Sequence, residues 1–327
     1  MNHAGPRPRR LLAVASLAVV VVTAALAVLW ITRSGAPRVP LDLDSLASYP
    51  PFVDASPGAS AGSTVTLSGA GDIVRCDEDR DEATAALLDN LPGWVFTAGD
   101  NVYDDGSARE FEECYDPSWG RQRERTFPAP GNHDFKTRGA AGYLGYFGER
   151  AGDPRAGWYA TDVGTWRLIV LASNCAEVGG CGPESDQGTW LARELAVNPR
   201  RCTIAIWHHP RFSTGEHGPI AAVTPFWEAL HPAGVELIVN GHDHSYERFV
   251  PLDAAGRTDP DRGIRQIVVG TGGAHLRGFP RDDPNSAVRS SESHGVLRLD
   301  LHEDSYDWEF IPVAGGAFSD RGSGTCH

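Results

Sequence analysis

Apolar and polar positions along the chain form two alternating kinds of segment. Short apolar runs, rich in β-branched residues and often followed by a Gly-Asp or Gly-Asn turn, predict buried strands. These runs are Thr64–Leu67, Trp94–Thr97, Cys202–Trp207, Val235–Val239 and Ile264–Val269. Between them lie helical patterns over Glu82–Leu91, Gln187–Leu195 and Ile220–Leu230. Strands that alternate with helices predict an α/β fold in which helices cover a sheet.

Antiparallel strands are predicted in two further places. Residues 157–173 favour a hairpin that turns at Val163-Gly164, and Gly295–Leu301 and Ser305–Val313 alternate apolar and polar residues. The sequence from residue 63 to residue 327 contains no internal repeat and no second boundary. We therefore expect a single domain over residues 63–327.

The amino end has the pattern of a membrane signal. Basic residues within positions 1–10 precede an uncharged apolar run over 11–31. At ~1.5 Å per residue, such a run is about long enough to cross ~30 Å of hydrocarbon. Basic residues before the run place its start in the cytoplasm and the rest of the chain outside. The run predicts either an uncleaved transmembrane anchor or a signal peptide cut near Ala25-Leu26-Ala27.

The segment that follows, residues 32–62, is rich in Pro, Ala, Ser and Gly and predicts a flexible linker. We therefore expect the domain to be extracytoplasmic, either attached to the membrane by an uncleaved anchor or secreted. The six cysteines agree with an oxidising compartment, because an even number in an exported chain predicts disulfides. Six cysteines allow 15 pairings. Chain order suggests Cys76–Cys114, Cys175–Cys181 and Cys202–Cys326. A thiolate metal site is disfavoured, because no C-x-x-C occurs.

Composition limits the class of function. Hydrophobic residues make up 41% and charged residues 22% of the chain, which excludes general disorder. The 43 acidic residues outnumber the 29 basic ones, for a formal net charge of −14. Phosphate backbones are repelled by such a surface, so we expect no nucleic-acid binding beyond possible nucleotide substrates. An anionic substrate would need a local source of positive charge.

Metal-type side chains follow five of the apolar segments. In open α/β sheets, ligands bind beyond the carboxyl ends of the strands, so these positions converge on one place. The five blocks are Gly71-Asp72, Gly99-Asp100-Asn101-Val102-Tyr103, Gly131-Asn132-His133-Asp134, His208-His209-Pro210 and Gly241-His242-Asp243-His244. Two carboxylates, a phenol, an amide and three imidazoles offer seven donors, too many for one tetrahedral zinc but suited to two metal ions. A shared aspartate would bridge two ions about 3.5–4 Å apart.

These blocks resemble, in order and spacing, those of the calcineurin-like metallophosphoesterases, and in particular their purple acid phosphatase branch. The resemblance covers about Ser63–Val313 and implies a four-layer α/β/β/α sandwich. Typical family members have Asp-x-His in the first block, whereas Val74 takes the histidine position here. In the purple branch a tyrosine replaces that histidine, and Tyr103 stands at its position. Tyr246-Glu247-Arg248 is also similar to that branch.

Carried over residue by residue, the resemblance implies two ligand sets that share one aspartate. The first metal would be held by Asp72, Asp100, Tyr103 and His244. The second metal would be held by Asp100, Asn132, His208 and His242. Because a phenolate prefers a hard trivalent ion, the resemblance implies Fe(III) with a divalent partner, which is Zn, Mn or Fe.

The expected reaction is hydrolysis of a small phosphate monoester by in-line attack of a metal-held hydroxide on phosphorus, with an acid to protonate the leaving group. His133, with Asp134 beside it to orient the ring, is one candidate acid. His217, in the Gly215–Gly218 loop, is the other. The alternatives are a phosphodiesterase acting on nucleotides or lipid head groups and, in another class, an inactive cell-surface binding module. An inactive module should have lost some of the ligands.

Overall fold

The computed structural model describes residues 64–152 and 157–327. The predicted basic segment, the anchor or signal and the linker, over residues 1–10, 11–31 and 32–62, lie outside the described residues. In the described part, no helix is both long enough and apolar enough to cross a membrane.

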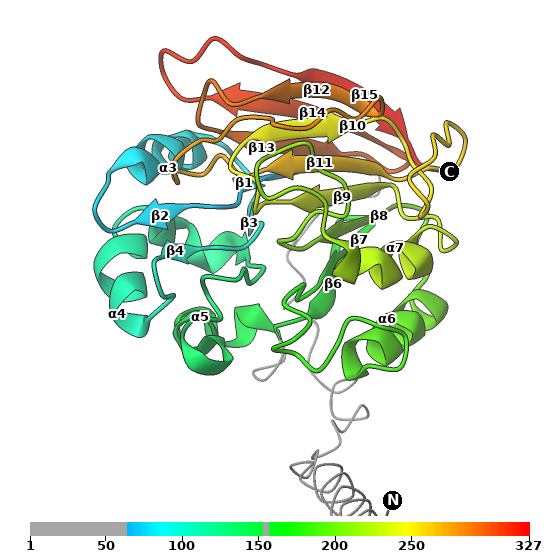
Figure 1. Cartoon of the computed structure of the whole chain (residues 1–327), viewed down its shortest axis with the longest axis horizontal. Coiled ribbons are helices and arrows are strands. Elements are labelled where there is room, and N and C mark those ends of the chain that lie inside the picture. Colours follow the sequence, from blue (N-terminus) through cyan, green and yellow to red (C-terminus); the bar gives the residue numbers. More distant parts are fainter. Residues whose placement is uncertain (1–63, 153–156) are drawn as a thin grey trace, which may run out of the picture. The chain divides into compact units, whose positions relative to one another are not determined.

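Two mixed β-sheets form the centre of the domain (Figure 1). The six-stranded sheet has the order β15-β14-β13-β1-β3-β5 and the seven-stranded sheet has the order β12-β10-β11-β9-β8-β7-β6, while β2 and β4 pair separately. The strands of the first sheet are β1 Val65–Ala70, β3 Trp94–Thr97, β5 Thr126–Phe127, β13 Gly295–Leu301, β14 Ser305–Pro312 and β15 Arg321–Thr325. Those of the second are β6 Tyr159–Val163, β7 Trp166–Val170, β8 Thr203–Ile206, β9 Leu237–Asn240, β10 Tyr246–Phe249, β11 Arg265–Val269 and β12 Ser286–Ser290. The separate pair is β2 Val74–Arg75 and β4 Val102–Tyr103.

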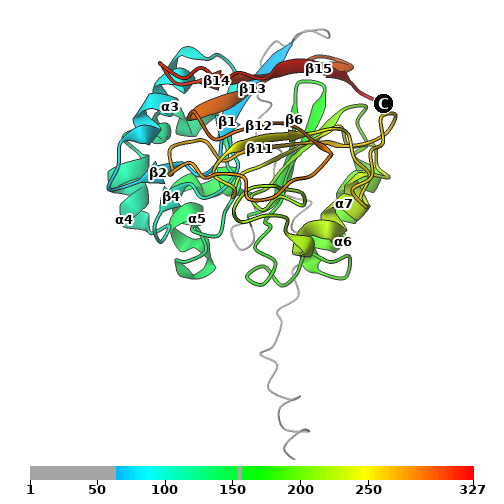
Figure 2. The same cartoon turned by 45° about the horizontal axis from the view of Figure 1, so that its top comes forward.

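The helices pack outside the sheets. They are α3 Arg80–Asn90, α4 Ala108–Glu110, α5 Ala141–Phe147, α6 Asp186–Val197 and α7 Thr224–Leu230. Short 3₁₀ or π turns lie between them: η1 Phe111–Tyr115, η2 Trp119–Arg125, η3 Arg138–Ala140, η4 Gly148–Ala151 and η5 Ala221–Val223. Figures 1 and 2 show α3, α4 and α5 beside the six-stranded sheet and α6 and α7 on the opposite side, beside the seven-stranded sheet.

Alternating side chains place the central strand β8 between two layers. In β8, Ile204 and Ile206 join a core that also contains buried residues of the six-stranded sheet. Ala205 and the following Trp207 point the other way, into a second core shared with α6 and α7. This period of two is that of a strand buried on both faces. The predicted α/β class is therefore confirmed, and the layers follow the order helices, sheet, sheet, helices.

Strand direction brings carboxyl ends together. β1 runs parallel to β3, which runs parallel to β5. In the other sheet β7, β8, β9 and β11 are all parallel. Antiparallel strands flank both groups: β13 beside β1, β6 beside β7 and β10 beside β11. The segments that were predicted to carry metal ligands therefore leave neighbouring parallel strands.

The sequence patterns located some elements better than others. The predicted strand at Trp94–Thr97 coincides with β3, and the hairpin around Val163-Gly164 is formed by β6 and β7. The predicted helix over Ile220–Leu230 is wrong at its start, because α7 begins at Thr224 after the 3₁₀ turn η5. Strands β10, β12 and β15 were not predicted. Each contains charged residues or glycines in place of an apolar run, so pairing with neighbouring strands decides their structure.

All three disulfides suggested by chain order are present: Cys76–Cys114, Cys175–Cys181 and Cys202–Cys326. All six cysteines lie within the described residues, and none of them is free. Cys202 directly precedes β8 and Cys326 directly follows β15, so the third bond links the two sheets. Because these residues are 124 positions apart, the bond also closes a long loop.

Replacing Cys202 and Cys326 together by alanine should lower the free energy of unfolding by about 4–5 kcal/mol, because the bond restricts the unfolded chain over a long loop. The matched double replacement of Cys175 and Cys181 opens a bond between residues only 6 apart and should cost about 2 kcal/mol. Urea unfolding followed by circular dichroism measures both losses. Equal losses would show that loop length does not govern the contribution of these bonds.

Candidate metal centre

All seven side chains proposed as ligands lie together at the carboxyl ends of strands from both sheets. Asp72 follows β1, Asp100 follows β3, Asn132 follows β5, His208 follows β8, and His242 and His244 follow β9; Tyr103 lies in β4. Their donor atoms form two groups.

In the first group, three donors surround one point. The Tyr103 hydroxyl donates to Asp72 Oδ1 at 2.9 Å and lies 3.3 Å from His244 Nε2. His244 Nε2 lies 3.4 Å from Asp72 Oδ1. All three side chains are buried, so these atoms face one another and not solvent.

In the second group, His208 Nε2 is the centre. It lies 3.1 Å from Asn132 Oδ1, 3.2 Å from His242 Nδ1 and 3.3 Å from Asp100 Oδ2. His208 is fully buried and Asp100 is almost so.

Asp100 stands between the two groups. Donor atoms of Asp72, Asp100 and His208 all lie within 4.8 Å of one another, although Asp72 belongs to the first group and His208 to the second. The Asp100 carboxylate also interacts with the Tyr103 hydroxyl, and its Oδ1 accepts the His133 amide N–H at 2.7 Å. This is the position a carboxylate shared by two cations would take.

The hydrogen bonds on the far side of two histidine rings show why cations fit here. His208 Nδ1 lies 2.9 Å from the Ala98 carbonyl, and His244 Nδ1 lies 2.9 Å from the His275 carbonyl. A carbonyl only accepts, so each Nδ1 carries hydrogen, and each Nε2 of the neutral ring presents its lone pair to other acceptors. Metal-binding histidines have this second hydrogen bond.

The spacing of the donors also fits metal ions. Ligands about 2.1 Å from one cation and at right angles to each other are about 3.0 Å apart. The separations of 2.9–3.4 Å within the two groups are of this size. Oxygen and imidazole donors of this mixed kind suit transition-metal ions. The residues present could therefore hold two of them.

The pKa values of the buried side chains in the pocket also indicate that it favours positive charge. Burial raises the pKa of Asp72 to about 7, and Asp100 adds to that shift. Burial and the neighbouring carboxylates of Asp100 and Asp72 raise the pKa of the Tyr103 hydroxyl well above its usual range. Burial alone would lower the pKa of His208, but the Asp100 carboxylate raises it to about 9. Without metal, the pocket therefore holds extra protons in place of positive ions.

The backbone is strained at three of the proposed ligands. Asp72, Asp100 and His242 have φ values of 58°, 50° and 73°, and Ala140 is the fourth non-glycine residue with positive φ in the described part. Such left-handed conformations cost roughly 1–3 kcal/mol each and collect at functional sites. Close packing adds a further constraint, because a Cβ at Gly131 would lie 2.2 Å from Asp100 Oδ1.

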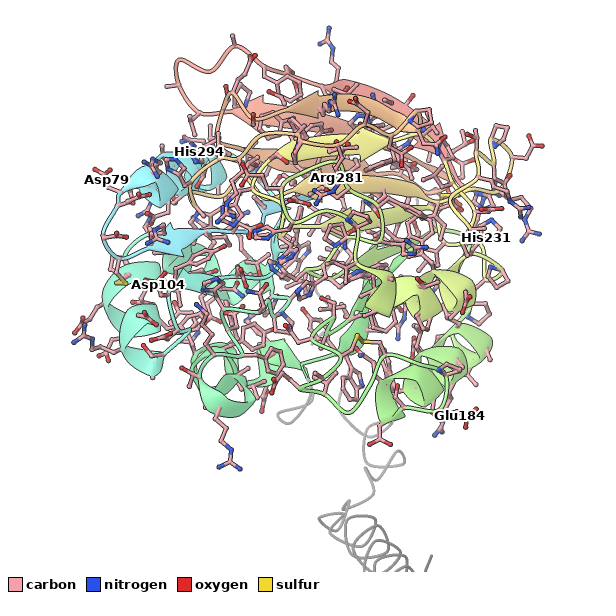
Figure 3. The ribbon with its side chains drawn as sticks, in the orientation of Figure 1. Asp79, Asp104, Glu184, His231, Arg281 and His294 are labelled. Atoms are coloured by element: carbon pink, nitrogen blue, oxygen red, sulfur yellow. A yellow bond between two sulfur atoms is a disulfide. The ribbon has the colours of Figure 1, made fainter. Side chains whose placement is uncertain are left out.

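His133 lies at the edge of the first group. Its ring packs on Tyr103, with ring centroids 4.2 Å apart. Its Nδ1 donates to the carbonyl of Asp104 at 2.6 Å, and the place of Asp104 beside β4 is marked in Figure 3. The other ring nitrogen, Nε2, is therefore the one available to exchange a proton.

The role given to Asp134 is corrected by the structure. Its buried carboxylate accepts from the Gly131 amide at 2.8 Å and from Asn101 Nδ2 at 3.0 Å, so it braces the loop and does not orient the ring of His133. The Asp104 carbonyl orients that ring instead. Burial, together with the charge of Asp100, raises the pKa of Asp134 to about 7.

His217 lies on the side of the second group. Its ring stacks on His242, with centroids 4.4 Å apart and planes at 28°. Its backbone N–H donates to Asp243 Oδ1 at 2.7 Å, which fixes the loop to the segment between His242 and His244. His209 also packs on His242, and its Nδ1 lies 2.8 Å from Ser173 Oγ.

The sequence motifs did not indicate how the loop that follows β11 supports the ligands. The Ala274 amide donates to the Asp72 carbonyl at 2.9 Å, the Arg277 amide donates to the His244 carbonyl at 2.8 Å, and the His275 carbonyl accepts from His244. The glycines at 270, 272 and 273, directly after a predicted strand, were the available signal. These glycines did not indicate a role in the site, because the loop contains none of the five blocks of metal-type side chains.

Comparison with known proteins identifies the family. Residues 69–246, more than half of the chain, match the model of the calcineurin-like phosphoesterases. The chain belongs to this family. It is similar to purple acid phosphatase 21 of Arabidopsis thaliana, with 31% identity over 160 residues, which is 46% of this chain and 35% of that protein. It is also 29% identical to an uncharacterized protein of Mycobacterium tuberculosis over 204 residues, which is 50% of this chain and 38% of that protein.

The chain thus spans less than two fifths of the length of these curated relatives. Solved structures share its fold. A purple acid phosphatase from yellow lupin seeds aligns with a TM-score of 0.63 and 18% identity, over 81% of this chain and 54% of that chain. GAP50, the anchor in the inner membrane complex of Plasmodium, aligns with a TM-score of 0.59 and 15% identity, over 79% of this chain and 88% of that chain. The predicted likeness to the purple acid phosphatase branch is confirmed, and the family implies a dinuclear metal centre.

Asp100→Ala should remove both metal ions, because this carboxylate lies between the two donor groups. Elemental analysis of the purified protein measures the loss, with circular dichroism to show that the fold persists. Asp104→Ala is the matched control, since it removes an exposed carboxylate but keeps the carbonyl that accepts from His133. Retention of two ions in Asp100→Ala would refute the bridging position.

Proposed function

We propose that this protein hydrolyses small phosphate monoesters at a centre of Fe(III) and one divalent ion, Zn, Mn or Fe. Its membership of the calcineurin-like phosphoesterases supports hydrolysis of a phosphoester. The single observation that carries the proposal is the convergence of seven donors in two groups with Asp100 between them. An inactive binding module is disfavoured because a metal-type side chain stands at each of the seven proposed ligand positions.

The choice of metals rests on the difference between the two groups. The first contains the phenol of Tyr103 and the carboxylate of Asp72, whereas the second adds only the neutral donors Asn132, His208 and His242 to Asp100. Because burial and two carboxylates oppose ionisation of Tyr103, a phenolate there needs a strongly charged cation. When bound, such a centre supplies positive charge to neutralise the phosphate and makes a water molecule a stronger nucleophile.

The chain's own residues provide the proton for the leaving group. His133 Nε2 can hold that proton, while the Asp104 carbonyl and the Tyr103 ring keep the imidazole in one orientation. The backbone N–H of His133 donates to Asp100, so the acid and the central carboxylate are fixed to each other. His217 lies on the opposite side, above His242, where it can donate to the phosphate.

We further propose that the domain acts outside the cytoplasm, either secreted or attached to the membrane. Three disulfides over residues 76–326 support this location, because such bonds persist in oxidising compartments. The apolar run over residues 11–31 supports export. Proteolysis of intact cells and amino-terminal sequencing of the exported protein would test location and cleavage separately.

The function is tested on the purified protein with three measurements. We expect two metals by elemental analysis, a visible charge-transfer band, and faster hydrolysis of 4-nitrophenyl phosphate than of bis(4-nitrophenyl) phosphate.

Tyr103→Phe should abolish the band and leave the fold intact, because the band requires the phenolate. A preference for the diester would favour the phosphodiesterase, and two metals without any hydrolysis would favour the binding module. Two metals without iron or colour would point to Mn or Zn.

His133→Ala should lower kcat by about 10²–10⁴-fold for alkyl phosphates, whose leaving groups need a proton. The loss should be much smaller for 4-nitrophenyl phosphate, because its leaving group is stable as an anion. Elemental analysis should show unchanged metal content. An equal loss for both substrates would mean that His133 acts in another role.

A further inference from the structure

An arginine outside every predicted motif lies at the rim of the metal centre. Arg277 NH1 lies 3.2 Å from Nε2 of His217, the ring that stacks on His242. The Arg277 side chain is 38% exposed. The guanidinium therefore contacts a ring that packs on a proposed ligand, and it is also partly open to solvent.

The position of Arg277 is fixed by the ligand segment itself. Its amide donates to the His244 carbonyl at 2.8 Å. The partner ring of His217 is also attached there, because its amide donates to Asp243. Arg281, labelled in Figure 3, donates to the carbonyls of Gly215 and Glu216 and secures the outer side of that loop.

The guanidinium of Arg277 is poorly paired for an arginine in this region. It has five N–H donors. Among the described residues its partners are the ring of His217 and, at the long distance of 3.9 Å, the carboxylate of Glu216. By contrast, Arg289 donates to Asp282 at 2.8 Å and Arg248 donates to Asp320 at 2.6 Å. Arg277 thus retains donors and charge for another anion.

The tautomer of His217 follows from this contact. A guanidinium only donates, so Nε2 of His217 accepts and the ring hydrogen lies on Nδ1. The pair therefore offers donors from two side chains, the remaining guanidinium N–H groups and the His217 Nδ1–H. Both residues are bonded through their backbone amides to the segment of residues 242–244, which carries one ligand of each group.

We propose that Arg277, positioned by His217, determines the preference of this site for phosphate monoesters by binding a terminal phosphate oxygen. This inference rests on the proposed function and adds the residue that would determine its substrate preference. At neutral pH a monoester is largely a dianion, whereas a diester carries one charge and one terminal oxygen fewer. A fixed cation beside the phosphate attracts the dianion more strongly. Arginine suits phosphate particularly, because its planar fork matches two oxygens.

The test compares two substrates and one ligand with metal-loaded protein. Arg277→Gln should raise KM for 4-nitrophenyl phosphate about 10- to 100-fold, the size of a lost charge-assisted hydrogen bond. KM for bis(4-nitrophenyl) phosphate should change less than threefold, so the monoester preference should fall by about the same factor. Arg277→Lys keeps the charge and should recover part of the preference. Metal content and the visible spectrum should stay unchanged in both variants.

The matched control is Arg298→Gln. Arg298 lies on β13, its side chain is 33% exposed and it pairs with Asp300, so the same charge is removed away from the centre. It should leave both KM values unchanged. Equal losses for the two substrates in Arg277→Gln, or a loss of metal, would overturn the proposal in favour of a structural role.

Inorganic phosphate separates this proposal from the function on which it rests. In calorimetric titration, Arg277→Gln should weaken phosphate binding about 10- to 100-fold relative to wild type and to Arg298→Gln. If wild type hydrolyses neither ester, the proposed function fails, yet this weakening would still support Arg277 as the anion-binding residue. Unchanged phosphate affinity in Arg277→Gln would overturn the proposal whichever esters are hydrolysed.

Discussion

Lone pairs that face one another in a buried pocket are the constraint on which this structure depends. His208 Nε2 and His244 Nε2 each meet other acceptors, because both rings use their N–H groups on backbone carbonyls. Such contacts are unfavourable unless cations or extra protons lie between the donors. The disulfide between Cys202 and Cys326 links the two sheets that supply the donors, and Asp72 and Asp100 enter the pocket from strained, left-handed backbone.

The two-sheet architecture makes this convergence possible. Parallel strands of both sheets end at the same place, so short turns after them deliver side chains from distant parts of the chain to one pocket. The chain as a whole is acidic, which would repel phosphate. Positive charge at the centre would come from the cations that the ligand sets can hold, and Arg277 lies at its rim. Net charge therefore says little about the anion this site would bind.

Much of the site could be predicted from the sequence, because ligands bind beyond the carboxyl ends of the strands in an α/β sheet. Asp72, Asn132 and His242 each follow an apolar segment, and their order and spacing indicated the family before any contact was known. The side chains that hold the ligand loops in place could not be predicted in the same way. Asp134 adjoins His133 in sequence, yet it braces Asn101 and Gly131, because side-chain direction depends on the local turn. Arg248, next to the last ligand block, pairs with Asp320.

The sequence by itself determined the α/β class and the seven candidate ligands, because these depend on local patterns. Chain order suggested one of 15 cysteine pairings, and the structure shows that this pairing forms. Only the tertiary structure decided which donors share a group, that the Asp104 carbonyl orients His133, and that Arg277 reaches the rim. It also decided strands β10, β12 and β15, whose sequences lack an apolar run. These features arise from contacts between segments far apart in the chain, and no local pattern of residues encodes which distant segment will be the neighbour.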